Sequence, residues 1–196
     1  MKKFILLLYT CAVLTSCADK PFVIIQIADA QLGFDAAVKG QAPDAEYVNA
    51  LTYETEFLKQ AVQKVNALKA DAVVFTGDQV NKPEDALQWD TFADAISEID
   101  SQTSVFHIPG NHDVLLSEGK VDITPFSSRY GEDRFVYSDN QVCIVGINSN
   151  LIKSNDPREE EQFEWMRSVL EAAGNHVVKL VCCHHPFFLA DIEEQD

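Results

Sequence analysis

Apolar runs that end in polar, metal-binding types of residue recur along this chain. Residues 72–75 form one such run, and Thr76-Gly77-Asp78 follows it directly. An apolar run that stops at a glycine is typical of a buried strand that ends in a sharp turn. We therefore expect the carboxylate of Asp78 at the carboxyl end of a central strand, which is where open α/β sheets bind ligands.

Three further predicted strands end in a similar way. Residues 22–28 run into Asp29-Ala30-Gln31, residues 105–108 run into Pro109-Gly110-Asn111-His112-Asp113, and residues 177–183 run into His184-His185-Pro186. Taken singly, each Asp is as readily a turn former or a helix cap. Together the strand ends supply carboxylate, carboxamide and imidazole groups, which are oxygen and nitrogen ligands of divalent metals. They therefore indicate a metal site.

The spacing of apolar residues between these strands predicts helices. We expect helices over about residues 44–69, after Pro83, and from a cap at Asp156 onward. Period-two alternation over residues 134–147 predicts a β-hairpin. Strands and helices that alternate along the chain predict an α/β layered domain. His107 lies inside a predicted strand and is expected to be a core histidine with its hydrogen bonds satisfied.

Composition and net charge limit the kinds of molecule that the chain is expected to bind. The chain has 196 residues, 46% of them hydrophobic, which is enough for one globular domain with a core. Its formal net charge of −16 argues against DNA, RNA or an anionic bilayer surface as a partner. Contact with a membrane is expected only through a lipid anchor.

That anchor is predicted from the N-terminal segment. A basic start, Met1-Lys2-Lys3, precedes an apolar stretch over residues 4–14 that is too short to span a membrane. The following Leu14-Thr15-Ser16-Cys17 resembles the lipobox of bacterial lipoproteins, so we expect lipidation of Cys17. The alternative is an ordinary secretory signal with an incidental Cys. Either way the mature protein is expected to be exported and, with the lipid, anchored to a bacterial membrane facing the periplasm or the cell exterior.

This interpretation divides the chain into three parts. They are a signal peptide, a tether and one domain, at residues 1–16, 17–21 and 22–196.

The strand-end motifs resemble those of the calcineurin-like metallophosphoesterase superfamily. Gly77-Asp78 and Gly110-Asn111-His112-Asp113 carry the resemblance, together with an Asp after the first strand and a His after the last. The resemblance extends from about residue 22 onward, and the GNHD run is its most specific part. It implies a four-layer α-β-β-α sandwich and a centre of two divalent metal ions, which would be Mn, Fe or Zn.

The resemblance also implies a set of metal ligands. Asp29 and Gln31 would bind the first ion, and Asn111 and His184 would bind the second. Asp78 would bridge the two ions. The family usually has Asp-x-His after the first strand, so a glutamine amide here would be a weaker ligand. The family also ends its site with Gly-His-x-His, which this sequence lacks, so the C-terminal part of the sandwich is expected to be missing.

Four other residues near the motifs are candidates for supporting roles. The ring of His112 suits stabilising a phosphoryl oxygen or protonating a leaving group, and Asp113 is expected to hold that ring in the required tautomer. His185 is expected beside the ligands or facing the substrate. Asn148 either caps a turn or lines the cleft, and the residue types do not decide between these roles.

The expected reaction is hydrolysis of phosphomonoesters by a hydroxide activated between two metal ions. The Asp29-Ala30-Gln31 form, with Asn148-Ser149 and the run 162–166, is similar to the subfamily of calcineurin-like phosphoesterase domain-containing protein 1. That subfamily implies phosphoserine or phosphothreonine among the substrates, whether on a small molecule or a protein. The alternatives are a phosphodiesterase or nucleotidase of the same fold, or a truncated, non-catalytic lipoprotein that binds phosphorylated ligands.

Overall fold

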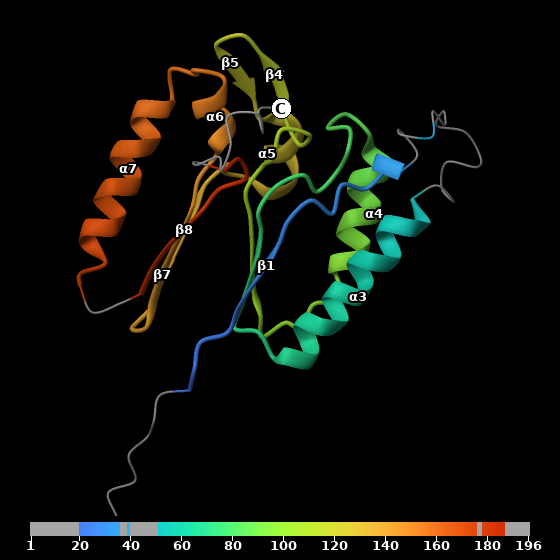
Figure 1. Cartoon of the computed structure of the whole chain (residues 1–196), viewed down its shortest axis with the longest axis horizontal. Helices are drawn as coiled ribbons and strands as arrows, with labels where there is room; N and C mark the ends of the chain where they lie inside the picture. The colour runs from blue at the N-terminus through green and yellow to red at the C-terminus, as the bar shows by residue number, and fades with distance from the viewer. Residues whose placement is uncertain (1–19, 36–38, 40–50, 176–177, 187–196) are drawn as a thin grey trace, which may run out of the picture.

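Two β-sheets face each other, and helices cover their outer faces (Figure 1). The computed structural model describes residues 20–35, 39, 51–175 and 178–186. The predicted signal segment, Cys17 and the start of the first predicted helix lie outside these residues and stay predictions from the sequence. Within the described residues the predicted four-layer α-β-β-α arrangement is confirmed.

The first sheet is parallel, and its strands end at one level. Its strands are β1, β2 and β3, at Ile24–Ile27, Ala72–Phe75 and Ser104–His107, in that order across the sheet. The register pairs Ile27 with Phe75 and Phe75 with His107. All four residues of the central strand β2 are buried, as expected for a strand covered on both faces. The polar residues that follow the three strands therefore emerge at the same edge.

Helices α3 (Thr52–Leu68) and α4 (Ala86–Ile96) cover the outer face of this sheet. Leu58 and Val65 of α3 and Phe92 of α4 pack with Phe75 of β2 in one apolar cluster. The helix predicted after Pro83 is confirmed, and it is capped by Asp85, whose side chain accepts from the backbone N–H groups of the first turn.

The second sheet contains the predicted hairpin. Its strands are β6, β7 and β8, at Phe135–Ser138, Val142–Gly146 and Val178–Cys182, in that order across the sheet. The β6–β7 pair is antiparallel and β8 is parallel to β7. Asp139 closes the hairpin turn, because its carboxylate accepts from the N–H groups of Gln141 and Val142.

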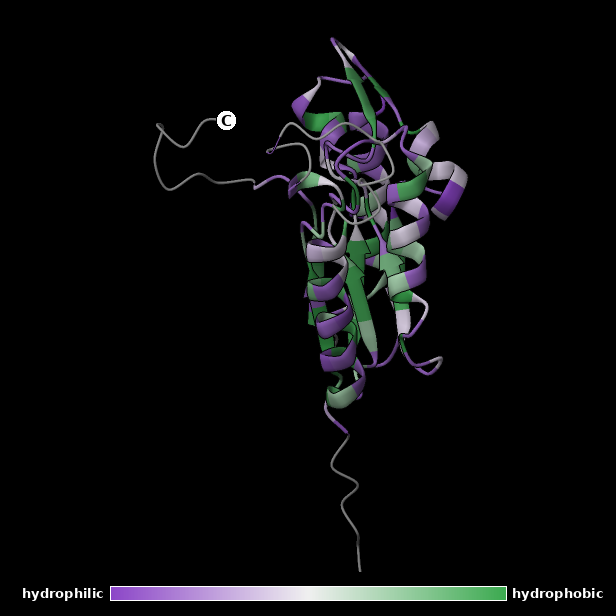
Figure 2. Ribbon diagram, turned by 90° about the vertical axis from the view of Figure 1, so that its right-hand side faces the viewer, coloured by the Kyte–Doolittle hydropathy of each residue, from purple (hydrophilic) through white to green (hydrophobic). Residues whose placement is uncertain are grey.

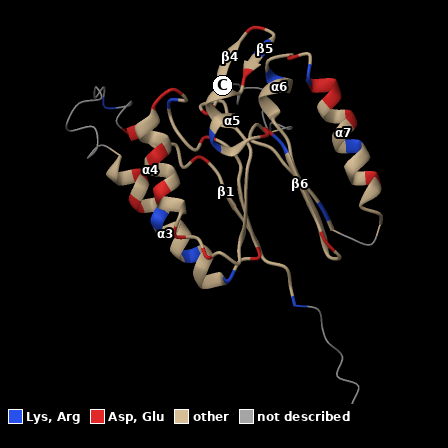
Figure 3. Cartoon of the chain, turned by 180° about the vertical axis from the view of Figure 1, so that it is seen from behind, with Lys and Arg blue, Asp and Glu red and all other residues tan. Residues whose placement is uncertain are grey.

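The two sheets meet through an apolar layer. Ala72 and Val74 of β2 pack with Val142 and Ile144 of β7. On the far side, Cys143, Val145 and Ile147 pack against the apolar face of α7 (Glu159–Ala172). Figure 2 shows the hydrophobic strands between helices whose outward faces are hydrophilic, and Figure 3 shows acidic residues along α3, α4 and α7.

The start of α7 differs from the prediction in its boundary. The regular helix begins at Glu159, but Asp156 Oδ1 accepts from the backbone N–H of Arg158 at 3.0 Å, so the predicted capping contact is present in the turn before the helix. The carboxylate of Asp156 has further partners: it accepts from the backbone N–H of Val121 at 2.8 Å and from Arg158 Nη2 at 2.7 Å. Asp156 thus joins the connection before α7 to a small hairpin that lies above the strand ends.

That hairpin and the short helices around it lie at the carboxyl ends of the strands (Figure 1). They are β4, β5, α5 and α6, at Leu115–Ser117, Lys120–Asp122, Thr124–Tyr130 and Ser149–Lys153. Their apolar side chains pack with Trp89, near the start of α4, in one cluster that also contains Val121, Phe126 and Leu151. In the described part of the chain, no helix has the length and apolar character needed to cross a membrane.

His107 lies in an aromatic stack and is not the satisfied core histidine that we predicted. Its ring stacks on Phe75 at 5.0 Å and on Tyr130 at 3.9 Å between centroids. Its Nδ1 is buried and has no hydrogen-bond partner among the described residues. Burial lowers the pKa of His107 to about 3, so the ring is neutral and contributes through packing.

The Asp156 contacts predict a pH-dependent contribution to stability. The side chain of Arg158 and backbone N–H groups hold the pKa of Asp156 well below its usual range. Its contribution is therefore fully present above the unfolded-state pKa of about 3.9 and is lost as the pH falls towards the lower folded-state value. Asp156→Asn should lower the free energy of unfolding by about 2 kcal/mol at pH 7 and by less at pH 3, measured by urea denaturation.

An exposed ion pair provides the control. Asp90 accepts from Arg129 at 2.6 Å, but its side chain is 69% exposed. Asp90→Asn should change the free energy of unfolding by no more than about 0.5 kcal/mol. A cost for Asp156→Asn that is the same at both pH values would contradict the assignment of the depressed pKa.

Candidate metal centre

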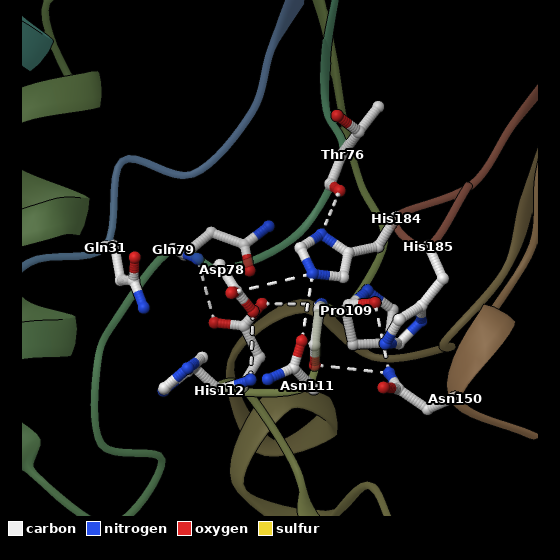
Figure 4. Close-up of polar contacts among 12 residues, drawn as sticks. Gln31, Thr76, Asp78, Gln79, Pro109, Asn111, His112, Asn150, His184 and His185 are labelled. Atoms are coloured by element: carbon white, nitrogen blue, oxygen red, sulfur yellow. Dashed lines mark hydrogen bonds and ion pairs between the residues drawn. The ribbon is translucent and has the colours of Figure 1, made fainter. Parts of the chain in front are cut away.

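The predicted metal ligands from four different strand ends meet at the carboxyl edge of the sandwich. The ligand atoms of Asp29, Asp78 and His184 all lie within 4.8 Å of one another. Asn111 joins them, because its Oδ1 lies 3.1 Å from His184 Nε2 (Figure 4). Asp29, Asp78 and Asn111 follow β1, β2 and β3 of the first sheet, whereas His184 follows β8 of the second. The site therefore spans both sheets.

The loops after β1 and β2 adopt an unusual backbone conformation. Asp29, Gln31 and Asp78 have φ angles of 54°, 41° and 52°, in the left-handed region. Such a conformation costs on the order of 1 kcal/mol for a residue other than glycine and is concentrated at functional sites. Two hydrogen bonds between the loops hold it, from Asp29 N to Gly77 O at 3.1 Å and from Gln31 N to Asp78 O at 2.8 Å.

Two glycines allow the loops to approach each other. A Cβ atom at Gly110 would lie 2.1 Å from Asp78 Oδ1 and 2.4 Å from Asp78 N. A Cβ atom at Gly77 would lie 2.6 Å from His184 Nδ1, and the φ of Gly77 is +103°. Neither contact leaves room for a side chain, so the Gly-Asp and Gly-Asn-His-Asp motifs owe their glycines to this close packing.

The tautomer of His184 follows from its hydrogen bond. Its Nδ1 lies 3.0 Å from the carbonyl oxygen of Thr76, which can only accept, so Nδ1 carries the proton. In the neutral ring the lone pair of Nε2 then faces Asp78 Oδ2 at 3.5 Å and Asn111 Oδ1 at 3.1 Å. Three electron-pair donors converge with no hydrogen between them. A divalent cation fits this donor set of imidazole, carboxylate and carboxamide.

The electrostatic environment of Asp78 also favours a bound cation. Burial raises its pKa, and the nearby Asp29 carboxylate raises it further. His184 and the backbone N–H of His112, which donates to Asp78 Oδ1 at 2.9 Å, oppose that rise. A bound cation would offset the free-energy cost of burying the charged carboxylate and would reduce its repulsion from Asp29.

Gln31 stands apart from this cluster. Figure 4 shows its side chain on the far side of Asp78 from His184 and Asn111. Its Nε2 lies 3.5 Å from Asn81 Oδ1. Its predicted role as a ligand of the first ion, together with Asp29, stays a prediction.

The ring of His112 is held by a different partner from the one predicted. Its Nδ1 lies 2.9 Å from the carbonyl oxygen of Asn81, so Nδ1 donates and Nε2 is left for other contacts. The prediction that Asp113 holds this ring is wrong. The physical reason is that both Asp113 oxygens accept from the backbone, as described next.

Asp113 is buried and ties the loops after β2 and β3 together. Its Oδ1 accepts from Gln79 N at 2.9 Å and from Val80 N at 3.2 Å, and its Oδ2 accepts from Gly110 N at 2.8 Å. Burial raises the pKa of Asp113 well above its usual range, and the three N–H groups oppose this rise. Asp113 therefore shapes the two loops that carry Asp78 and Asn111.

The loop after β7 contributes residues that the sequence interpretation left open or missed. Asn148 caps α6, since its Oδ1 accepts from Asn150 N at 3.0 Å. His185 lies beside the predicted ligand His184, and both its backbone N and its Nδ1 are 2.9 Å from Ser149 Oγ. The part played by Asn150, whose side chain reaches the loop after β3, was not predicted. The only signal was its position at another strand end.

Comparisons with known proteins indicate the family of the chain. The family model described as calcineurin-like phosphoesterase matches residues 22–195. Serine/threonine-protein phosphatase CPPED1 of Bos taurus is 29% identical over 188 residues, which cover 90% of this chain and 59% of that protein. The chain thus spans less than two thirds of the length of this curated relative.

Two solved structures resemble the fold. A dimetal phosphatase from Danio rerio has a TM-score of 0.56 and 19% identity, over 87% of this chain and 71% of its own. A purple acid phosphatase from yellow lupin, Lupinus luteus, has a TM-score of 0.53 and 16% identity, over 81% of this chain and 29% of its own. At these identities the likeness concerns the fold alone.

The packing of Gly110 predicts the effect of a single added methyl group. Gly110→Ala should lower the free energy of unfolding by about 3 kcal/mol, because its Cβ would meet the backbone as well as the side chain of Asp78. The measurement is urea denaturation in the presence of EDTA, so that no metal contributes.

Gly119→Ala is the matched control. Gly119 has a φ of +66°, but a Cβ atom there would meet nothing within 4 Å. It should cost only the backbone strain, about 1 kcal/mol. Equal costs for the two variants would contradict the close approach of the loops.

Proposed function

Because the chain belongs to the calcineurin-like phosphoesterase family, we propose that it hydrolyses phosphate esters with the help of bound divalent metal ions. The family implies such ions. The observation that supports the proposal most directly is the convergence of Asp29, Asp78 and His184 within 4.8 Å, with the Nε2 lone pair of His184 directed at Asp78 and Asn111.

In this proposal the residues divide between two ions. Asp29 and Gln31 would hold one ion, Asn111 and His184 would hold the other, and Asp78 would contribute to both. When bound, the ions would polarise the phosphoryl oxygens and lower the pKa of the attacking water. The chain itself supplies the fixed positions of the ligands. Thr76 O orients His184, and the N–H of His112 holds one oxygen of Asp78.

His112 is proposed to protonate the leaving group. The carbonyl oxygen of Asn81 holds Nδ1–H of the ring at 2.9 Å in both protonation states, so the proton that moves is the one on Nε2. The fixed ring orientation also keeps Nε2 pointing in one direction, which a general acid requires.

The proposed substrates are phosphomonoesters, with phosphoserine and phosphothreonine as the first to test. The support is the printed description of the bovine relative as a serine/threonine-protein phosphatase. Hydrolysis rates of p-nitrophenyl phosphate and bis(p-nitrophenyl) phosphate, compared under the same conditions, separate a monoesterase from a diesterase. Faster turnover of the diester would overturn the monoesterase proposal.

Loss of either central ligand should abolish the reaction. With added Mn²⁺, Asp78→Asn and Asn111→Ala should each lower kcat/KM for p-nitrophenyl phosphate by at least about 100-fold, and EDTA should have the same effect on the unmodified protein. The control is Asp94→Asn, a carboxylate change on the exposed side of α4, which should leave the rate unchanged. Full activity in both ligand variants would overturn the assignment.

The role of His112 is tested by the leaving group. His112→Asn should lower kcat by about 10²–10⁴-fold for phenyl phosphate, whose leaving group needs a proton, and by clearly less for p-nitrophenyl phosphate, whose leaving group does not. An equal loss with both substrates would instead assign His112 to stabilising a phosphoryl oxygen.

A further inference from the structure

Three buried carboxamides gather where the second sheet meets the metal centre. Asn148 and Asn150 follow β7, and Gln162 projects from α7. All three are fully buried. Apart from Asn150 Oδ1, which has no partner among the described residues, their side-chain polar groups are paired. The partners lead towards the Gly-Asn-His-Asp loop.

The side chain of Asn150 reaches across from the second half of the sandwich to this loop. Its Nδ2 lies 3.2 Å from the carbonyl oxygen of Pro109 (Figure 4). The same nitrogen lies 3.2 Å from the carbonyl oxygen of Gly110 and 2.9 Å from Asn148 Oδ1. All three neighbours are acceptors, so the amide nitrogen must face them. The contact ends on Gly110, the residue directly before Asn111.

The carboxamide of Asn150 is itself held in place. The side chain of Gln162 makes two hydrogen bonds to the backbone of Asn148: it accepts from the N–H at 2.8 Å and donates to the carbonyl oxygen at 3.1 Å. The side chain of Asn148 donates to Asp133 Oδ2 at 2.8 Å. Helix α7 thereby fixes Asn148, and Asn148 fixes Asn150 through its Oδ1.

The Pro109–Gly110 segment is therefore held from both sheets. Asp113 accepts from Gly110 N on the side of the first sheet. Asn150 donates to the carbonyl oxygens of Pro109 and Gly110 on the side of the second sheet. Asn111 follows at once, and its Oδ1 has to reach a point 3.1 Å from His184 Nε2.

We propose that Asn150 is a positioning residue for the metal centre, which sets the place of Asn111 by holding the carbonyl oxygens before it. The inference rests on the proposed function, since it assigns Asn111 to a metal. It adds that Asn111, a proposed ligand that follows the first sheet, is positioned by Asn150, which follows a strand of the second sheet. Loss of a residue that orients a ligand typically costs 10–100-fold in metal affinity.

Asn150→Asp tests the proposal in the complete chain. The change keeps the size of the side chain but turns a carboxylate oxygen towards three oxygen acceptors, so the loop should be pushed away. We expect the dissociation constant for Co²⁺, titrated into metal-free protein, to rise by about 10–100-fold. The visible absorption of the bound Co²⁺ should also change, because the carboxamide ligand is displaced. Asn150→Ala, which removes the donor without adding charge, carries the same expectation should the Asp variant fail to fold.

Asn66→Asp is the matched control. Asn66 also joins backbone groups of separate elements, donating to Glu98 O at 2.8 Å and accepting from Asp100 N at 2.9 Å. It lies in the last turn of α3, at the opposite end of the sheet from the metal centre. It should lower the thermal midpoint in EDTA but leave the Co²⁺ dissociation constant and spectrum unchanged.

The outcomes separate the two proposals. If the unmodified protein binds no Co²⁺, the metal-dependent function is overturned, and the role of Asn150 falls with it. If the unmodified protein binds Co²⁺ and both Asn150 variants bind it with the same dissociation constant and spectrum, only the positioning role is overturned. Weaker binding and an altered spectrum in the Asn150 variants, but not in Asn66→Asp, support it.

Discussion

A single buried carboxylate determines how the two central loops of the site face each other. Asp113 accepts from the N–H groups of Gln79, Val80 and Gly110, so it bonds the loop after β2 to the loop after β3. These three hydrogen bonds to one buried carboxyl group hold the two loops together directly. With the two loops joined, Asp78 and Asn111 face the same space, and the glycines at 77 and 110 give the backbones room to do so.

The sandwich completes what this contact begins. The apolar layer between the sheets, with Val74 against Ile144, sets their separation, and the parallel pairing of β7 with β8 places His184 opposite the ends of the first sheet. The hydrogen bond from His184 to Thr76 O then crosses the boundary between the sheets. The packing of the core between the sheets thus determines where the side chain of His184 lies at the edge of the sandwich.

Much of this could be predicted from the sequence, because strand ends are local features. An apolar run followed by Gly-Asp or Gly-Asn-His-Asp specifies both the strand and the polar group after it, so the positions of Asp29, Asp78, Asn111 and His184 follow from the pattern. The partner of a side chain is not local. Asp113 is adjacent to His112 in the sequence, yet its carboxylate points to backbone groups on another loop.

The same reason explains the other differences. Asp156 makes the capping contact expected from its residue type and spacing, but its second oxygen also accepts from Val121, which is distant in the sequence. Asn150 carries no periodic signal, and its role depends on a loop from the other half of the sandwich. The stretch that forms β4 and β5 escaped prediction because its apolar residues Leu115 and Leu116, which are 37% and 44% exposed, follow neither period.

The site draws on β1 at one end of the described chain and on β8 at the other, so it cannot form before both strands are in place. Contacts between residues so far apart in sequence form slowly, because the entropy of closing the loop between them must be paid first. A chain in which only the first sheet has formed lacks His184 at the site, so the candidate site is complete only when both sheets have assembled.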